Sequence, residues 1–551
     1  MNISIEVNKN RDYKVKRRII ILLLLFVALM GKAQKKEHFT LFTDRDLYVS
    51  GETLLFKVFV PEDDQSGIVN VDLVNTNGRI ISEVSKKIID HQTDGFIALP
   101  DSLSSGSYLV CTSTKINPSL TVKELYISNQ FAGLPESNHA LRSSETDLFV
   151  EMAATTLQIE GLDKTYKTRG KASLTLDFTP ELLSQIDENL FVSVTEADQD
   201  YNSKTFFRLN KPKKNQIVEK EGVILDGFVK DVKTGEPFKK GVVFLSVPDT
   251  IPRFKYFITG NDGYFIFRLD NYIGRIPVVV QGFDPDDKRL LKVVINHRDS
   301  LKSAVPQLET WNFSSELRKS TGNNIDASMF CKIFNYQEIT ALPIPFNKSE
   351  EYPFYGVATE IVNTKLFIDL PEFTEIAREL LSGVKFRANN RIPSLQIFNP
   401  ALHNYFAEPP LLLIDGIPVR DLNVIKDMGS KDINRIEICH SKRFYGNLIF
   451  YGVVAIHTSK HDYTGIKASD DLIKFDLDAI QPDIILNTTV GLKLNEMDLR
   501  KVLLWKPSIK PEKNIKLDFE TSDIKGNYRL IIHGKTKDGS NFYKEQFFEV
   551  N

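Results

Sequence analysis

Residues 53–60 read T-L-L-F-K-V-F-V, and this stretch decides the fold class. Its periodicity of about two and its β-branched and aromatic side chains are typical of a β-strand. Similar runs occur at residues 107–110, 242–245, 275–280 and 528–532. Tight-turn signals divide such runs, each suited to positive φ angles: Asn77-Gly78, Asp94-Gly95, Asp262-Gly263, Asp415-Gly416 and Asp538-Gly539. The pattern predicts a mainly β protein built of serial β-sandwiches.

Length and charge limit the classes of protein to consider. At roughly 150 residues per domain, 551 residues predict three to four domains rather than one core. The chain has 70 Lys and Arg against 72 Asp and Glu, a formal net charge of −2. Because a nucleic-acid-binding protein normally carries a basic surface, we expect no nucleic-acid partner.

The first 33 residues resemble a secretory signal peptide in composition. Basic residues between Lys9 and Arg18 precede an apolar run at residues 19–30, and Gly31 and Ala33 supply the small side chains that a signal peptidase reads. A membrane anchor is the alternative, but the run is shorter than the roughly twenty residues that a spanning helix needs. We therefore expect cleavage after Ala33 and export to the periplasm, with no transmembrane segment afterwards.

Three widely separated cysteines are present, Cys111, Cys331 and Cys439. Exported proteins that depend on disulfides normally have more cysteines, in even number. One bridge stays open as an alternative, but we expect buried thiols that act as small hydrophobic side chains.

Composition shifts divide the chain into units. An amphipathic helix is predicted at residues 371–381 (PEFTEIARELL), because Pro stands at its start and its apolar side chains share one face. The predicted order is a signal peptide (1–33), β-sandwiches (38–130, 145–210 and 221–300), an unassigned connector (301–369), a small α+β domain (370–460) and a C-terminal β-sandwich (461–551).

Two stretches near the predicted mature start carry a first resemblance. Residues 42–57 (FTDRDLYVSGETLLFK) resemble the opening of a macroglobulin-like domain, where a D-R-x-x-Y-x-x-G-E segment leads into a strand, and residues 99–109 fit the same pattern. Residues 145–210 resemble a second such domain. The resemblance implies β-sandwiches. Thioester trap chemistry is excluded, because none of the three cysteines begins the Cys-Gly-Glu-Gln sequence that it needs.

A second resemblance follows at residues 222–245 (GVILDGFVKDVKTGEPFKKGVVFL) and 259–267 (TGNDGYFIF). These are similar to the carboxypeptidase regulatory-like domain. That resemblance implies a small β-sandwich without catalytic residues, whose role is spacing and contact.

A third resemblance covers residues 410–419 (PLLLIDGIPV), 432–438 (DINRIEI), 445–446 (YG) and 451–458 (YGVVAIHT). Together they look like the plug domain of TonB-dependent receptors, although residues 440–444 (HSKRF) replace the family's usual small-residue run. The resemblance implies an α+β domain. It assigns structural or docking roles to Asp415, Gly416, Pro418, Asp432, Ile436, Glu437, Tyr445, Gly446 and Gly452.

A plug domain normally sits inside its own 22-stranded barrel. At about ten residues per strand, the strands alone need roughly 220 residues, and only about 90 follow the last plug-like motif. Those residues resemble the β-domain that follows the plug in macroglobulin-and-plug proteins of Gram-negative envelopes. The resemblance therefore implies that the plug-like domain acts on the barrel of another chain.

Catalytic, cofactor and metal motifs are missing from the sequence. The nine histidines show no ligand spacing, and there is no G-x-S-x-G elbow, Walker loop or dinucleotide fingerprint. Residues 62–64 and 284–287 are acidic enough to hold calcium, but solvated turns are favoured. We expect no catalytic residues, no cofactor and no metal.

These inferences favour a non-enzymatic protein of the Gram-negative periplasm, peripheral to the outer membrane. Its plug-like domain would dock to, seal or gate a separate outer-membrane β-barrel channel, either a secretion translocon or a nutrient transporter. The alternative is a periplasmic module that binds a peptide or glycan along an exposed sheet edge. An enzyme is disfavoured, and a deep polar pocket in residues 301–370 would reopen it.

Overall fold

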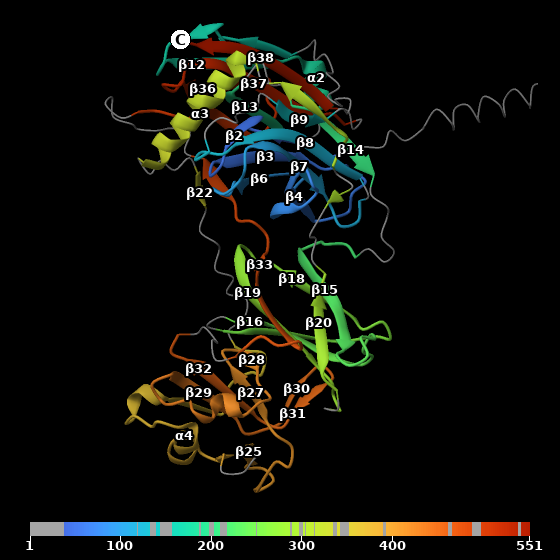
Figure 1. Cartoon of the computed structure of the whole chain (residues 1–551), viewed down its shortest axis with the longest axis vertical. Helices are drawn as coiled ribbons and strands as arrows, with labels where there is room; N and C mark the ends of the chain where they lie inside the picture. The colour runs from blue at the N-terminus through green and yellow to red at the C-terminus, as the bar shows by residue number, and fades with distance from the viewer. Residues whose placement is uncertain are drawn as a thin grey trace, which may run out of the picture.

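Strand pairing divides the chain into three β-sandwiches and one small α+β domain (Figure 1). The chain is mainly β, as predicted. The computed structural model describes residues 38–117, 119–132, 139–143, 157–186, 189–197, 203–209, 217–248, 251–286, 289–296, 301–302, 305–312, 314–333, 339–341, 352–388, 393–460, 466–486, 497–537 and 541–551. The predicted signal peptide lies outside these residues.

Sandwich 1 is built from the first strands of the described chain. One sheet has the order β1-β3-β6 and the other β14-β8-β7-β4-β5, with β2 beside β8. Its strands are β1 (Thr40–Thr43), β2 (Leu47–Val49), β3 (Thr53–Phe59), β4 (Ile68–Asn75), β5 (Ile80–Lys87), β6 (Gln92–Ala98), β7 (Gly106–Ser113), β8 (Ser119–Ser128) and β14 (Thr205–Leu209).

Sandwich 2 joins two segments that lie more than 300 residues apart in the sequence. Its sheets have the orders β10-β12-β36 and β11-β38-β37-β13-β35. A short helix, α2 (Pro180–Gln185), links β12 to β13. Its strands are β10 (Leu157–Glu160), β11 (Thr165–Tyr166), β12 (Lys171–Phe178), β13 (Leu190–Glu196), β35 (Val502–Ile509), β36 (Asn514–Glu520), β37 (Gly526–Lys535) and β38 (Asn541–Val550).

This arrangement corrects the sequence-based division into separate sandwiches at 145–210 and 461–551. Strand β12 pairs with β36 over seven residues, so that Leu174 lies opposite Leu517, and both side chains are buried in one shared core. A single sheet cannot bury its apolar face alone, so neither segment makes a core by itself. Three strands of the predicted units belong elsewhere: β14 to sandwich 1, β33 (Leu472–Asp478) to sandwich 3, and β34 (Ile484–Leu486) to a two-stranded sheet with β22 (Ile339–Ala341).

Sandwich 3 covers the segment predicted as a third β-sandwich (221–300) and adds a strand from residues 472–478. Its sheets have the orders β18-β15-β20 and β17-β16-β19-β33. Its strands are β15 (Gly222–Asp231), β16 (Val242–Val247), β17 (Arg253–Ile258), β18 (Tyr264–Asp270), β19 (Arg275–Phe283), β20 (Leu291–Ile295) and β33 (Leu472–Asp478).

The small α+β domain, residues 352–460, contains a mixed sheet of order β23-β29-β32-β27-β28. Strands β27 and β32 are parallel, whereas β29 and β32 are antiparallel. Its elements are β23 (Glu360–Asn363), η2 (Thr364–Leu366), α4 (Phe373–Glu379), β24 (Val384–Arg387), β25 (Ser394–Asn399), β26 (Asn404–Tyr405), β27 (Leu411–Ile414), β28 (Ile417–Pro418), α5 (Asn423–Lys426), β29 (Ile433–Cys439), β30 (Arg443–Tyr445), β31 (Leu448–Phe450) and β32 (Val453–Thr458).

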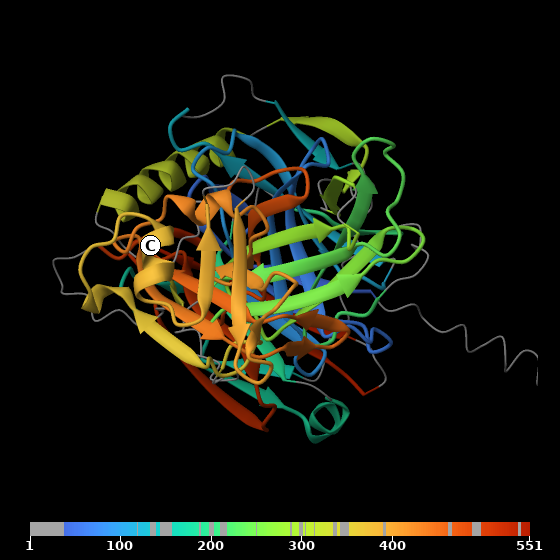
Figure 2. The ribbon, with the colours of Figure 1, turned by 90° about the horizontal axis from the view of Figure 1, so that it is seen from below.

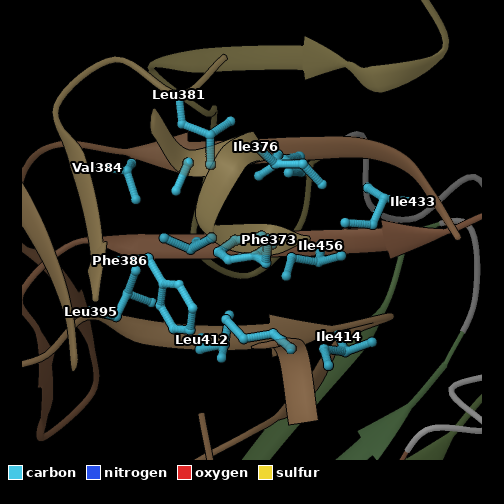
Figure 3. Close-up of a cluster of buried hydrophobic side chains, with 14 of the residues drawn as sticks. Phe373, Ile376, Leu381, Val384, Phe386, Leu395, Leu412, Ile414, Ile433 and Ile456 are labelled. Carbon is cyan, nitrogen blue, oxygen red and sulfur yellow. The ribbon is translucent and has the colours of Figure 1, made fainter. Parts of the chain in front are cut away.

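Helix α4 confirms the predicted amphipathic helix and supplies part of the core of this domain. Phe373 and Ile376 are fully buried against the sheet, and the ring of Phe373 meets that of Phe386 edge-on at 5.3 Å (Figure 3). The helix begins two residues after Pro371. Proline disrupts a helix interior but is tolerated at or just before the first turn, so this position is compatible with the helix.

The predicted connector at 301–369 contains more regular structure than the sequence indicated. Strand β23 belongs to the small domain, and helix α3 packs beside β2 of sandwich 1. Strand β9 pairs with β21, and β22 pairs with β34. The elements are β9 (His139–Ser143), β21 (Leu308–Asn312), α3 (Ser315–Ile333), β22 (Ile339–Ala341) and β34 (Ile484–Leu486).

Sandwiches 1 and 2 together form one part of the molecule, which we call the base. Sandwich 3 and the small domain form the other part, which we call the arm (Figure 1). Sandwiches 1 and 2 make the upper part of Figure 1, sandwich 3 follows, and the small domain lies at the opposite end. Seen from below, the orange strands of the small domain lie beside the green strands of sandwich 3 (Figure 2). None of the three cysteines is in a disulfide; Cys111 and Cys439 are buried as expected, and Cys331 is half-buried.

Candidate docking surface

The Asp415-Gly416 turn seats the small domain on sandwich 3. The Asp415 carboxylate accepts hydrogen bonds from the backbone N of Thr458 at 2.8 Å and from its hydroxyl at 2.6 Å, which ties the turn to β32. Gly416 has φ +83°, and a Cβ at this position would lie 2.1 Å from Cβ of Pro252. The Gln281 side chain donates to the Pro418 carbonyl at 3.0 Å. Asp415, Gly416 and Pro418, three of the predicted plug residues, therefore lie at the contact between the small domain and sandwich 3.

The Tyr445-Gly446 turn makes a second part of the same contact. The Tyr445 hydroxyl donates to the carbonyl oxygen of Phe254 at 2.7 Å, and the Asn447 backbone N donates to the Tyr256 hydroxyl at 2.8 Å. A Cβ on Gly446 would lie 2.1 Å from that hydroxyl. Because both turns meet β17 or the segment before it, the small domain has a fixed seat on sandwich 3.

Aromatic side chains fill the space between these polar contacts. Phe254 of sandwich 3 stacks on Phe354 of the small domain with ring centres 4.2 Å apart, and Tyr445 lies against both rings. The Arg420 guanidinium lies 5.0 Å from the ring centre of Phe283. Offset aromatic pairs and cation–π contacts add to the free energy of apolar burial, so this interface is well stabilised.

Glu437 and Ile436 hold the sheet of the small domain together. Ile436 is fully buried in the core. The Glu437 carboxylate accepts from the Tyr355 hydroxyl at 2.7 Å and from Arg435 Nε at 2.9 Å, and His457 Nε2 lies 3.2 Å away. Burial alone would raise the pKa of Glu437, but His457, Tyr355 and Arg435 lower it to about 2. The carboxylate is thus charged and paired at neutral pH.

The remaining predicted plug residues also have structural roles. Gly452 has φ +91°, and a Cβ there would meet Ile397 at 2.8 Å and the Cys439 carbonyl oxygen at 3.0 Å. The Asp432 backbone donates to the Gly429 carbonyl and accepts from the Ser459 amide. The nine residues therefore help to build the small domain and to seat it on sandwich 3, and other residues of the domain offer a surface for another molecule.

An apolar loop at residues 364–370 provides such a surface. Both ends are held: the Thr364 hydroxyl donates to the Ile433 carbonyl at 2.6 Å, and the Leu370 backbone N donates to the Ser430 hydroxyl at 2.9 Å. Between these anchors the tip carries three consecutive large apolar side chains in solvent. Their exposed fractions are 78% for Leu366, 51% for Phe367 and 80% for Ile368.

Charged side chains frame the apolar loop. Lys365 Nζ donates to the backbone carbonyl of Lys431 at 2.7 Å, and the Lys431 side chain lies 3.2 Å from the Asp369 carboxylate. These contacts fix the loop against β29 and its preceding turn. An ordered loop that keeps three adjacent apolar side chains in water is typical of a contact surface, because folding alone gives no reason to expose them.

Strand β23 extends this surface. It pairs only with β29 among the described strands, so it is an edge of the mixed sheet. Ile361 on this strand is 62% exposed, three residues before the tethered end of the loop at Thr364. Both features lie in or directly beside the stretch at 301–369 to which the sequence pattern assigns no fold. In the sequence, the apolar loop is marked by three consecutive large apolar residues, Leu366-Phe367-Ile368, between the charged residues Lys365 and Asp369.

Two further observations concern a membrane-spanning helix and a metal site. Within the described ranges, no helix combines the length and apolar character needed to cross a membrane. Among the same residues, no three His, Cys, Asp or Glu side chains converge as metal ligands would.

Comparisons with known proteins give distant likenesses only. No protein family matches the chain, and no curated protein does. A Salmonella α2-macroglobulin reacted with methylamine aligns over 93% of this chain and 39% of its own, with 10% identity and a TM-score of 0.22. Trypsin-activated α2-macroglobulin from Escherichia coli aligns over 93% of this chain and 23% of its own, with 9% identity and a TM-score of 0.16. The chain thus spans well under half the length of these proteins, and likeness at this level says nothing of what it does.

Proposed function

We propose that this chain is a non-enzymatic adaptor that presents its small domain to a separate protein at the outer membrane of a Gram-negative cell. The partner in this proposal is a β-barrel channel of secretion or nutrient transport, which the small domain docks to, seals or gates. Its export to the periplasm is part of the same proposal. The observation that carries it is the apolar loop, whose tip is exposed on the small domain.

Physical chemistry supports a protein partner for this loop. Burying a Leu, Ile or Phe side chain contributes about 1.5–3 kcal/mol each, so three adjacent ones supply a binding anchor. The contacts of Thr364 and Leu370 hold the loop ends in place before binding. Less conformational entropy is then lost on association than for a flexible segment.

The experiment is co-purification from detergent-solubilised envelopes of a Gram-negative host that carries the natural partner genes. The tagged wild-type protein should recover an outer-membrane β-barrel protein. The triple variant Leu366→Ser, Phe367→Ser, Ile368→Ser should lose at least nine-tenths of it. Leu290→Ser is the matched control, because Leu290 is a 71% exposed apolar residue on sandwich 3. Recovery of no barrel protein by the wild type would contradict the docking proposal.

A second candidate function is capture of an extended peptide along β23. It is favoured by the edge position of this strand and by the exposed Ile361. Strand addition needs only free backbone groups on such an edge. Retention of a peptide by the purified soluble protein, in the absence of any membrane protein, would favour this candidate over docking to a channel.

A further inference from the structure

Residues 479–486 lead from the arm back to the base, and we call this segment the strap. Its first residues are fixed to sandwich 3. The Ala479 backbone N donates to the Gly274 carbonyl at 3.0 Å, and the Gly274 backbone N donates to the Ile480 carbonyl at 2.8 Å. Both Ala479 and Ile480 are buried. The strap therefore starts as part of the sandwich 3 core.

The next residue pairs with sandwich 1. The Gln481 backbone N donates to the Ser85 carbonyl at 2.8 Å. Its side-chain amide accepts from the Phe96 backbone N at 3.1 Å and donates to the Phe96 carbonyl at 2.7 Å. Ser85 lies on β5 and Phe96 on β6, and each of these strands ends its own sheet. One glutamine thus covers the open edges of both sheets of sandwich 1.

Lys86 holds the same segment from the side of sandwich 1. Its Nζ donates to the carbonyls of Gln481 and Pro482, both at 3.3 Å, and to the Asp483 carboxylate at 2.5 Å. The Lys86 side chain is buried, whereas that of Asp483 is exposed. Hydrogen bonds from a buried ammonium are stronger than neutral ones, so Lys86 adds to the hold on the strap.

The end of the strap reaches the junction of sandwiches 1 and 2. Ile484 and Leu486 pack against the apolar cluster that includes Phe59 of sandwich 1 and Trp505 of sandwich 2. Strand β34 of the strap also pairs with β22 as the chain rises from β33 in Figure 1. Eight consecutive residues therefore contact the cores or edges of all three sandwiches.

We propose that the strap is the joint that fixes the direction of the arm relative to the base, with Gln481 and Lys86 as its positioning residues. A second contact between arm and base lies at the start of sandwich 3, where the Gly67 backbone N donates to the Glu219 carbonyl, Lys115 Nζ donates to the Ile224 carbonyl, and Lys87 Nζ lies 3.4 Å from the Glu221 carboxylate. Strand β33 also lies beside β5 next to the strap. If the bonds of the strap are lost, we expect the arm to rotate relative to the base about this contact at the start of sandwich 3. This inference goes beyond the proposed function, because it holds whatever the apolar loop binds.

The test uses the purified full-length protein and the double variant Lys86→Met, Gln481→Ala. Small-angle X-ray scattering should give one rigid envelope for the wild type and, for the variant, a larger radius of gyration with a broadened distribution of distances. Hydrogen exchange at the Phe96 amide should accelerate by at least tenfold. Gln396→Ala is the matched control, because Gln396 also donates to a backbone carbonyl but lies inside the small domain.

Each outcome decides between a joint and a passive linker. A double variant with wild-type scattering and wild-type protection of Phe96 would overturn the proposal. If the double variant fails to fold, Lys86→Met alone keeps the Gln481 bonds and is tested in the same way. Wild-type scattering from that folded variant would then overturn the role of Lys86, whereas a broadened distribution would support the joint.

Discussion

Glu52 of sandwich 1 and Lys501 of sandwich 2 form a buried ion pair, with Lys501 Nζ 2.7 Å from Glu52 Oε1. The other carboxylate oxygen of Glu52 accepts from Arg45 at 3.2 Å. Arg45 also bonds to Asp44, whose carboxylate accepts from the Tyr48 hydroxyl at 2.8 Å. The charged and aromatic residues of the D-R-x-x-Y-x-x-G-E segment thus form one network, and its last member joins sandwich 1 to sandwich 2.

Removal of Lys501 should therefore destabilise the base. Burial alone would raise the pKa of Glu52, but Lys501 and Arg45 lower it below its ordinary value of 4.5. Lys501→Met should cost about 3–5 kcal/mol at pH 7, because it leaves a buried carboxylate short of its partner. The cost should shrink as the pH falls through the folded-state pKa of Glu52, where the pair is lost in the wild type as well.

Urea unfolding at pH 7 and at acid pH measures this effect. Lys516→Met is the matched control, because Lys516 and Asp518 are 3.9 Å apart and both exposed. Such a surface pair contributes about 0–1 kcal/mol. Equal losses for Lys501→Met and Lys516→Met would show that the buried pair does not hold the base together.

Leu174 and Leu517 should behave as neighbours in one core although 343 positions separate them. Each change to Ala should cost about 2–5 kcal/mol, because it removes buried methyl groups and leaves a cavity. The double variant should show a coupling of about 0.5 kcal/mol or more in a double-mutant cycle from denaturant unfolding. Strict additivity would contradict the shared sandwich formed by β12 and β36.

Gly416→Ala should loosen the seat of the small domain. At φ +83° any other L residue is strained by about 1–2 kcal/mol, and the added Cβ would also meet Pro252. Gly356→Ala isolates the first effect, because Gly356 has φ +76° and open space around its Cβ position. Hydrogen exchange at the Asn447 amide, which donates to Tyr256, should accelerate in Gly416→Ala only. Equal exchange in both variants would rule out a contribution of this turn to the interface.

The Glu437 network should make the small domain sensitive to acid. The folded-state pKa of about 2 is below the ordinary 4.5, so the stabilisation is complete above pH 4.5 and is lost as the pH falls toward 2. Glu437→Gln should lower stability at pH 7 and flatten its dependence on pH in this window. Glu408→Gln, at an exposed carboxylate of the same domain, should leave the wild-type curve unchanged. If the stability of Glu437→Gln still falls between pH 4.5 and 2 as in the wild type, groups other than Glu437 cause the acid sensitivity.

Local features of the fold were open to prediction from the sequence. Period-two runs such as residues 53–60 became strands, and the Asp415-Gly416 pair became a tight turn with both φ angles positive. The helix predicted at residues 371–381 formed as α4 (Phe373–Glu379), because its apolar side chains repeat on one face. Each of these depends on neighbours within a few residues, which periodicity and turn chemistry report directly.

Long-range pairing was not open to prediction in the same way. Strands β12 and β36 each show a good β pattern, but a pattern does not name its partner, so two halves of one sandwich were assigned to two units. The apolar loop was missed for a related reason. Leu366, Phe367 and Ile368 are typical of a buried strand by composition, and only the anchoring of Thr364 and Leu370 to residues 430–433 places them in solvent.

Site-specific photo-crosslinking tests the central claim most directly. A photoreactive amino acid at Phe367, in the apolar loop, should crosslink in intact envelopes to an outer-membrane β-barrel protein identified by mass spectrometry. The same probe at Leu290 should give at most one-tenth of that product. A folded protein that yields no barrel crosslink from position 367, or equal yields from both positions, would contradict docking through the loop.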